Sequence, residues 1–473
     1  MSLKAVSKEG NIVYVCFISV VAALGGFLFG YDTAVISGTI GMVTEQFDLT
    51  SVTQGWYVSS ALIGSIFGVL IAGWISDVLG RKKAMVISAL MFFISAAGCA
   101  VSGTMTVLII YRILGGIGIG MISIISPMYI SEIAFAKFRG ALVTLYQLAI
   151  TLGFLAAYLV NFKLLDYALN TQSFGDAFFQ KLLIDEVWRG MLGMEAVPAF
   201  LFFLIVFLLP RSPRWLFVRG KQDETRNVLG KIYNSATAIE TEISNMKSSV
   251  LNDDSSNWKL LKKPNLLKAV LIGAAIAILG QFMGVNAVLY YGPTIFEQSG
   301  VSGGDALFYQ VLVGAVNVLT TLIALYIIDK VGRKKLVYFG VTGMIITLVL
   351  IAVYFYMGDT YGWSSVFLLV LFLAYIFFTA ISISAVIFVL LSEMYPTKIR
   401  GLAMSIAGFS LWIGTFMVGQ LTPWLLESLS PEGTFLLFAL MCLPYMYIIW
   451  KLVPETTGKT LEEIEAYWNK GAQ

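Results

Sequence analysis

Two charged residues stand inside long apolar runs of the sequence and are the first candidates for chemistry. Asp32 lies near the end of the first run, and Arg112 lies early in the fourth. A charge in an apolar run is costly and therefore marks a functional site by default. An acid near a guanidinium binds or releases a proton according to the strength of that pairing. We therefore predict that Asp32 and Arg112 approach each other and form a proton-binding pair.

Neutral polar and aromatic side chains form a second candidate set within the apolar runs. They are Gln147, Gln281, Asn286, Tyr290, Asn317 and Trp412. Neutral hydrogen-bonding groups beside aromatic faces suit a neutral polar ligand, for which a charged side chain offers no advantage. Gly284, Gly292 and Pro293 interrupt the run that carries Gln281, so a helix there can break and expose its backbone to the ligand.

The composition of the chain excludes several classes of protein. Of the 473 residues, 58% are hydrophobic and only 12% are charged, about half the roughly 25% usual in soluble domains. The net charge of 31 − 28 = +3 is too small for a nucleic-acid-binding protein. Because the chain has no histidine and its three cysteines lie far apart, we expect no metal site, no cofactor and no His-based catalysis. A chain in contact with lipid remains.

Twelve apolar segments are long enough to cross a bilayer as helices, at about 20 residues each. They cover roughly residues 12–31, 55–76, 84–104, 107–128, 140–161, 189–209, 267–292, 306–328, 336–357, 364–392, 402–425 and 433–453. The loops after spans 2, 4, 8 and 10 are rich in Lys and Arg, whereas those after spans 1, 3, 7, 9 and 11 carry almost none. Basic loops face the cytoplasm. We therefore predict an all-α polytopic protein of the inner (plasma) membrane with both termini inside.

Charged motifs recur in the same order in the two halves of the chain. Each half has an Asp and an Arg after its second span and a Glu and an Arg after its fourth, and the two sets are Asp77, Arg81, Glu132 and Arg139, and Asp329, Arg333, Glu393 and Arg400. This duplication predicts two pseudo-symmetric six-helix bundles, over 1–210 and 266–454, with a cytoplasmic helical linker over 211–265 and a tail over 455–473. Because charges at facing helix ends can pair, we expect these eight residues to gate the cytoplasmic side.

These motifs, together with the segments 210–216 and 454–458, resemble the sugar porter branch of the major facilitator superfamily over essentially the whole chain. The resemblance implies a monosaccharide transporter that is not an enzyme and that imports its sugar with a proton by alternating access. It implies that Asp32 and Arg112 are the proton-coupling pair. It also implies that Gln147, Gln281, Asn286 and Asn317 hydrogen-bond the sugar, that Trp412 stacks on it, and that Phe29 and Tyr290 close over it. We expect a functional monomer.

The chain departs from the pattern of this family at three places. Gly280 replaces the first Gln of a Gln-Gln pair in span 7, and Phe388 replaces the Trp of a Gly-Pro-x-x-Trp run in span 10, where the proline is also lost. Arg211 stands where a Glu is usual. Since Gly280 and Phe388 fall at expected sugar-binding positions, we expect an altered preference, which leaves open a hexose, a pentose, a deoxyhexose, an inositol or another polyol.

Four other functions are compatible with parts of this pattern. An uncoupled sugar facilitator shares the fold, but such relatives carry Asn at the position of Asp32. A non-transporting sugar sensor usually has a longer cytoplasmic tail. A drug–proton antiporter shares the superfamily fold but lacks the sugar porter motifs, and a membrane-embedded enzyme needs a cluster of catalytic groups that the sequence does not show.

Overall fold

The computed structural model describes residues 10–135, 138–171, 173, 175–251, 263–396, 399–455, 464 and 468. The predicted linker residues 252–262 and most of the predicted tail lie outside the described residues. The described chain is built of helices, with one isolated β-bridge between Gly10 and Tyr233. This agrees with the all-α prediction, because only a helix satisfies every backbone polar group within a single membrane-spanning segment.

Twelve helices or helix pairs in the described residues are long and apolar enough to cross a membrane, which is the predicted number. They are α2 (Ile12–Val35) with η1 (Ile36–Gly38), α4 (Ser51–Leu79), α5 (Arg81–Val101), α6 (Met105–Ile133), α7 (Arg139–Asn170), α9 (Val187–Gly193) with α10 (Ala196–Val206), α14 (Pro264–Phe282) with α15 (Val285–Gln298), α16 (Gly303–Val331), α17 (Arg333–Tyr361), α18 (Ser365–Thr379) with α19 (Ala385–Met394), α20 (Arg400–Ser428) and α21 (Ser430–Lys451).

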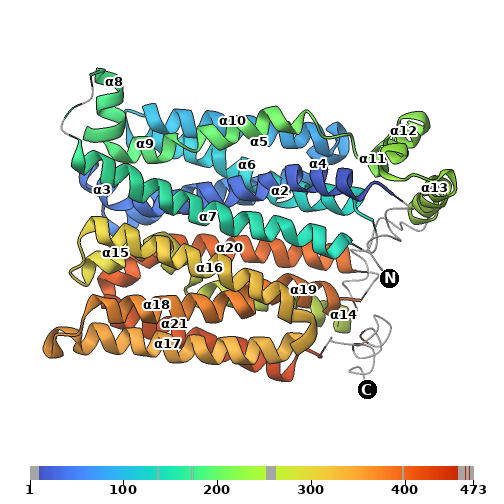
Figure 1. Cartoon of the computed structure of the whole chain (residues 1–473). Helices are drawn as coiled ribbons and strands as arrows, with labels where there is room; N and C mark the ends of the chain where they lie inside the picture. Colours follow the sequence, from blue (N-terminus) through green and yellow to red (C-terminus); the bar gives the residue numbers. More distant parts are fainter. Residues whose placement is uncertain are drawn as a thin grey trace. The chain divides into compact units, whose positions relative to one another are not determined.

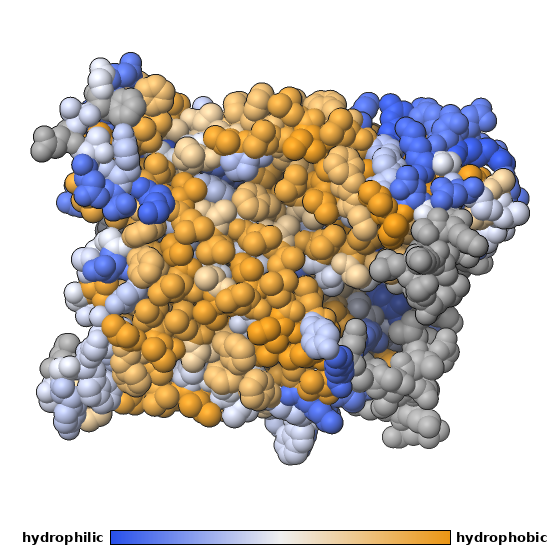
Figure 2. Space-filling model, in the orientation of Figure 1, coloured by the Kyte–Doolittle hydropathy of each residue, from blue (hydrophilic) through white to orange (hydrophobic). Residues whose placement is uncertain are grey.

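Large apolar side chains cover the outer faces of these helices. Phe67 and Trp74 on α4 and Leu319 and Tyr326 on α16 are more than half exposed. Figure 2 shows hydrophobic residues along the sides of the helices and hydrophilic residues gathered at their ends. So much exposed apolar surface is unfavourable in water, and it fits a surface that faces lipid.

The cytoplasmic linker contains three short helices, α11 (Pro213–Val218), α12 (Gln222–Ile232) and α13 (Ala236–Leu251). The sequence predicts the last two from their amphipathic patterns, but α11 is unexpected. It begins where the Ser212 side chain accepts a hydrogen bond from the backbone N–H of Trp215, at 3.1 Å, with Pro213 in the first turn. Figure 1 shows the three helices together at one end of α4, α5 and α10.

Residues 162–188 lie between the predicted spans 5 and 6, and the sequence predicts a long outer loop for them, which is wrong in part. Helix α7 continues to Asn170, and residues Ala177–Asp185 form α8 (Ala177–Gln180) followed by a π-helical turn. Lys163 and Asp166 suggest a loop by their charge. A helix that satisfies its own backbone can nevertheless carry charged residues into water beyond the membrane.

The contacts divide the chain into two compact units whose boundaries fall inside helices. The first unit contains residues 1–33, 63–154 and 192–255, and the second contains residues 34–62, 155–191 and 256–473. Parts of the first, second, fifth and sixth spans therefore pack with the last six spans. The division at residues 210 and 266 that the repeat predicts remains a prediction about which parts move together.

In the first unit, glycines allow α4 and α6 to pack with their backbones in close approach. A Cβ atom added at Gly64 would lie 2.3 Å from the carbonyl oxygen of Ile113, and one added at Gly120 would lie 2.1 Å from that of Ser65. Such distances exclude any side chain. The glycine-rich run of span 4 therefore serves helix packing, as is common between membrane helices.

In the second unit, a polar network joins α3 (Ile40–Gln46) to the start of the sixth span. The indole N–H of Trp188 donates to Gln46 Oε1 at 2.6 Å, and Gln46 Nε2 donates to Glu186 Oε2 at 2.9 Å. Partial burial raises the pKa of Glu186, but hydrogen bonds from Gln46 and Arg189 and the charges of Arg189 and Lys181 outweigh it, so the net pKa lies below its ordinary value.

Candidate functional site

The predicted pair of intramembrane charges forms a buried ion pair in the first unit. Arg112 Nη1 on α6 donates to Asp32 Oδ1 at 3.2 Å, and each side chain is only 2% exposed. Asp32 lies within α2, which continues to Val35, so it does not cap the end of the helix. A buried ion pair is costly to desolvate and is therefore more readily explained by function than by stability.

A second buried acid, which the sequence reasoning missed, completes this site. Glu195 is 2% exposed and lies where α9 gives way to α10, and its carboxyl interacts electrostatically with both Asp32 and Arg112. Neither Asp32 Oδ2 nor Glu195 Oε1 accepts a hydrogen bond from a donor group among the described residues, and the two carboxyl groups lie within hydrogen-bonding reach of each other. Two carboxyl groups that share one guanidinium can hold a proton between them, and the site is neutral when they do.

The polar side chains predicted on span 7 join a third one on span 11, within the second unit. Gln281 Oε1 accepts hydrogen bonds from Asn286 Nδ2 at 2.7 Å and from Thr415 Oγ1 at 3.1 Å. Thr415 lies one helical turn after the predicted residue Trp412. Thr415 could not be singled out from the sequence, because threonines are common in membrane helices and usually bond to their own backbone. Thr415 Oγ1 also lies 2.9 Å from Leu411 O of its own helix, so its single proton serves either that carbonyl or Gln281.

Span 7 breaks at one of the places predicted to allow it. Gly284, at φ 89°, separates α14 from α15, and Tyr375 donates its hydroxyl proton to the freed carbonyl of Met283 at 2.7 Å. The helix does not break at Pro293, but that proline cannot donate to the carbonyl of Leu289, four residues earlier.

Two other helices satisfy the carbonyl that Pro293 leaves free. Tyr158 Oη of α7 donates to Leu289 O at 2.9 Å, and Gln310 Nε2 of α16 donates to it at 3.1 Å. Tyr158 and Gln310 are both essentially buried. The outer half of span 7 is therefore held in place from two sides by hydrogen bonds to its backbone.

The other predicted sugar-site residues are placed within their own units. Tyr290, Asn317 and Trp412 in the second unit are 2%, 9% and 7% exposed. Phe388, in the same unit, is 48% exposed. Phe29 on α2 and Gln147 on α7, both half-buried, belong to the first unit. The predicted sugar-binding residues therefore fall into two subsets, one in each unit.

The cytoplasmic motifs form the same arrangement twice. Arg81 Nη2 lies 2.9 Å from Glu132 Oε1 in the first unit, and Arg333 Nη2 lies 2.9 Å from Glu393 Oε1 in the second. Each arginine also donates to the carbonyl five residues before it, at 3.2 Å and 3.3 Å. Each follows a glycine of positive φ, Gly80 or Gly332. The repeat seen in the sequence thus extends to individual hydrogen bonds.

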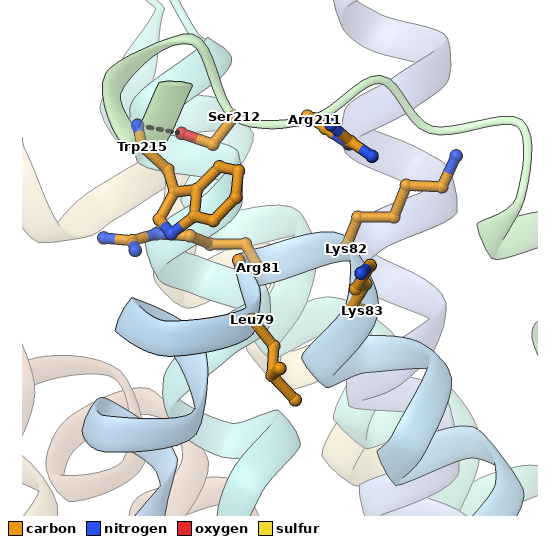
Figure 3. Close-up of a pocket in the computed structure, with 8 residues that line it drawn as sticks. Leu79, Arg81, Lys82, Lys83, Arg211, Ser212 and Trp215 are labelled. Atoms are coloured by element: carbon orange, nitrogen blue, oxygen red, sulfur yellow. Dashed lines mark hydrogen bonds between the residues drawn. The ribbon is translucent and has the colours of Figure 1, made fainter. Parts of the chain in front are cut away.

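The linker packs on the first of these motifs. Ser212 Oγ donates to Glu132 Oε2 at 2.5 Å, and the indole N–H of Trp215 donates to the carbonyl of Asp77 at 2.8 Å. Figure 3 shows the Trp215 indole beside Arg81, with Ser212 and Arg211 on the same stretch of chain, around a small cavity. Arg211, which stands where a Glu is usual, pairs with Glu224 of α12 at 3.0 Å.

The remaining motif residues have separate surroundings. Asp77 is largely exposed and pairs with Arg81 at 3.1 Å. Arg139 is exposed at the start of α7, and Arg400 donates to the carbonyl of Tyr395 at 3.2 Å. The side chain of Asp329 lies outside the described residues.

Comparisons with known proteins identify the family. The family model for sugar (and other) transporters matches residues 18–468. This chain belongs to the sugar transporter family. It is 38% identical to the arabinose-proton symporter of Bacillus subtilis over 465 aligned residues. The alignment covers 98% of this chain and 97% of that protein. It is 36% identical over 494 residues to the D-xylose-proton symporter of Escherichia coli, with 98% and 97% covered.

Solved structures agree with this assignment. The transporter matches the xylose transporter XylE from E. coli in a partially occluded inward-open conformation, with a TM-score of 0.81 and 34% identity over 95% of this chain and 100% of that chain. The predicted major facilitator fold with twelve membrane helices is confirmed, and the chain is a multi-pass membrane transporter and not an enzyme.

Span 10 of the transporter remains irregular although it lacks the expected proline. Residues Ala380–Ser384 form a π-helical segment (η4) between α18 and α19. Such segments often occur at functional sites, because they shift the register of the helix that follows them. The lost proline is therefore replaced by another kind of irregularity, four residues before Phe388.

Proposed function

We propose that the transporter imports a monosaccharide, a pentose or a hexose, together with a proton. The observation that carries the proposal is the buried Asp32–Arg112 pair with Glu195 beside it. An uncoupled facilitator has no use for three buried charges, because a neutral sugar needs none of them. The named relatives, an arabinose-proton and a D-xylose-proton symporter, support the same substrate class and the same coupled ion.

The cluster couples the two solutes through its charge. When both acids are ionised, the attraction between Asp32 and Arg112 ties α2 to α6 and leaves one negative charge in excess. A proton entering from outside removes the excess negative charge and weakens the attraction between Asp32 and Arg112, so α2 is free to move relative to α6. One proton crossing 100 mV releases about 2.3 kcal/mol, which sustains a roughly 40-fold sugar gradient.

The sugar site follows from the neutral side chains. Gln147, Gln281, Asn286 and Asn317 supply hydrogen bonds, and the aromatic residues Phe29, Tyr290, Phe388 and Trp412 face the C–H surfaces of the ring. The mutual hydrogen bonds of Gln281, Asn286 and Thr415 support this part of the proposal, because they orient amide groups that a sugar can share.

The cytoplasmic motifs serve as the gate in this scheme. Ion pairs of Arg81 with Glu132 and of Arg333 with Glu393 hold the ends of neighbouring helices together within each unit. These ends are then displaced as rigid pieces. We place these motifs and both termini on the cytoplasmic side of the inner membrane, on the evidence of the basic loops, and propose a monomer as the working unit.

Replacement of Asp32 by Asn tests the coupling role. Purified Asp32→Asn protein in liposomes is expected to exchange labelled sugar across the membrane but to lose uphill uptake driven by an imposed pH gradient. Asp166→Asn, which changes an exposed acid on α7, is the matched control and should keep both activities. Uphill uptake that survives in Asp32→Asn refutes the coupling role of this acid.

A further inference from the structure

Position 280 in span 7 is a glycine for no reason that its backbone provides. Gly280 is buried within α14, and its φ is not positive. A Cβ atom added there would lie 3.6 Å from Ile387 Cδ1, 3.7 Å from Tyr445 Cε2 and 3.8 Å from Ile383 Cγ2, which are ordinary van der Waals distances. A methyl group therefore fits the protein, and it would fill the room that the glycine leaves between these three side chains.

Tyr445 of α21 lies beside position 280 and carries an unsatisfied polar group. The side chain is fully buried, and its hydroxyl has no hydrogen-bond partner among the described residues. The neighbours Ile383 and Ile387 are apolar and offer none. A buried hydroxyl without a partner is unfavourable and calls for an explanation, and a ligand that supplies the partner is one.

The location of this hydroxyl relates it to the proposed sugar site. Gly280 directly precedes Gln281, whose amide bonds to Asn286 and Thr415. Helix α14 thus presents one face to α20, where a Cβ atom added at Gly414 would lie 3.1 Å from the Gln281 side chain, and the neighbouring face to Tyr445. A ligand that reaches Gln281 lies one residue from position 280.

We propose that Gly280 and Tyr445 form one subsite, in which Tyr445 Oη hydrogen-bonds a single hydroxyl group of the transported sugar. The inference rests on the proposed function and deepens it, because it names a residue of span 12 as a determinant of sugar specificity. Gly280 leaves the room through which the sugar reaches Tyr445. A glutamine there, as the family usually has, would occupy this space with its own amide.

Competition by deoxy-sugars tests the proposal. Exchange of a labelled sugar in liposomes is measured for the wild type and for Tyr445→Phe, with competitors that each lack one hydroxyl group. Tyr445→Phe is expected to lower the affinity for the parent sugar about 2- to 12-fold, which is the effect of losing one hydrogen bond. One deoxy-sugar should bind both proteins equally, because it lacks the hydroxyl that Tyr445 contacts. An equal change for every competitor, or no change for any, overturns the proposal.

Two further variants separate sugar binding from a structural role. Tyr447→Phe removes the hydroxyl of an exposed tyrosine on the same helix and should change nothing. The methyl group of Gly280→Ala fits the protein. This variant should lower the affinity for the sugar, while its unfolding temperature without sugar stays unchanged. Without sugar, Tyr445→Phe should be at least as stable as the wild type, whereas a lower unfolding temperature means that the hydroxyl bonds within the protein and contradicts the subsite.

The outcome for the wild type distinguishes failure of the proposed function from failure of the subsite. If the wild type exchanges no pentose or hexose, the proposed function itself fails. If it exchanges sugar but Tyr445→Phe shows no selective effect on one deoxy-sugar, only the subsite fails.

Discussion

The hydrogen bond from Tyr158 to the carbonyl of Leu289 should hold the predicted external side of the transporter closed. It joins α7, from the first half of the chain, to the outer half of span 7 at 2.9 Å in a buried setting. Outward opening has to separate these helices and break the bond. The variant Tyr158→Phe removes the hydroxyl, keeps the ring and should therefore favour the externally open state.

The size of this effect follows from what remains on the carbonyl. Gln310 still donates to Leu289 O in Tyr158→Phe, so the loss is that of one ordinary hydrogen bond, about 0.5–1.5 kcal/mol, or a 2- to 12-fold shift. In a Gln310→Met background the carbonyl has no second donor. The same change then costs the externally closed state about 1–3 kcal/mol, which shifts the equilibrium toward the externally open state by about 5- to 140-fold.

External labelling of a buried cysteine measures the shift. Leu62 is buried on α4, and a Cβ atom added at Gly419 of α20 would lie 2.9 Å from it. Leu62→Cys, with the three native cysteines replaced, should react with a membrane-impermeant maleimide only when these helices separate. Tyr167→Phe, on an exposed part of α7, is the control. Equal labelling rates with and without Tyr158→Phe in both backgrounds refute the reasoning.

Three further predictions concern other parts of the molecule. A Cβ atom at Gly55 would lie 2.2 Å from the backbone oxygen of Gln420, so Gly55→Leu should prevent external closure and reduce transport more than tenfold, whereas Gly73→Leu, with open space around it, should not. The lowered pKa of Glu186 means that its ionised form stabilises the fold above its ordinary value of 4.5 and that this contribution is lost as the pH falls through its folded-state pKa. The unfolding temperatures of wild type and Glu186→Gln should therefore differ at pH 7 and converge in acid; a constant difference contradicts the assignment. Glu132→Gln should destabilise the protein by about 1–3 kcal/mol in thermal unfolding, because a largely buried arginine loses its charged partner, and an unchanged unfolding temperature excludes that contribution.

The sequence predicted the elements of this fold well because each is encoded locally. Apolar runs give the twelve spans, and the repeated motifs single out the residues of the pairs Arg81–Glu132 and Arg333–Glu393, although not which of them pair. The predicted end of span 5 at residue 161 came too early, because the apolar run ends there while the helix continues past it to Asn170.

Contacts between distant segments were harder to predict. Glu195 was overlooked although it lies inside a predicted span, and an acid in such a run was a sufficient signal to find it. Thr415 carried no such signal, since nothing in the sequence indicates which of many threonines meets Gln281. The hydroxyl of Tyr445 is of the same kind, because its lack of a partner depends on three helices that are far apart in the chain.

Proton movement measured together with sugar movement tests the central claim most directly. The wild-type transporter is reconstituted in liposomes that contain a pH-sensitive dye, and a pentose or hexose is added outside at equal pH on both sides. Proton symport predicts that the lumen becomes acidic as the sugar enters. Entry of the sugar without acidification would contradict symport and identify an uncoupled facilitator.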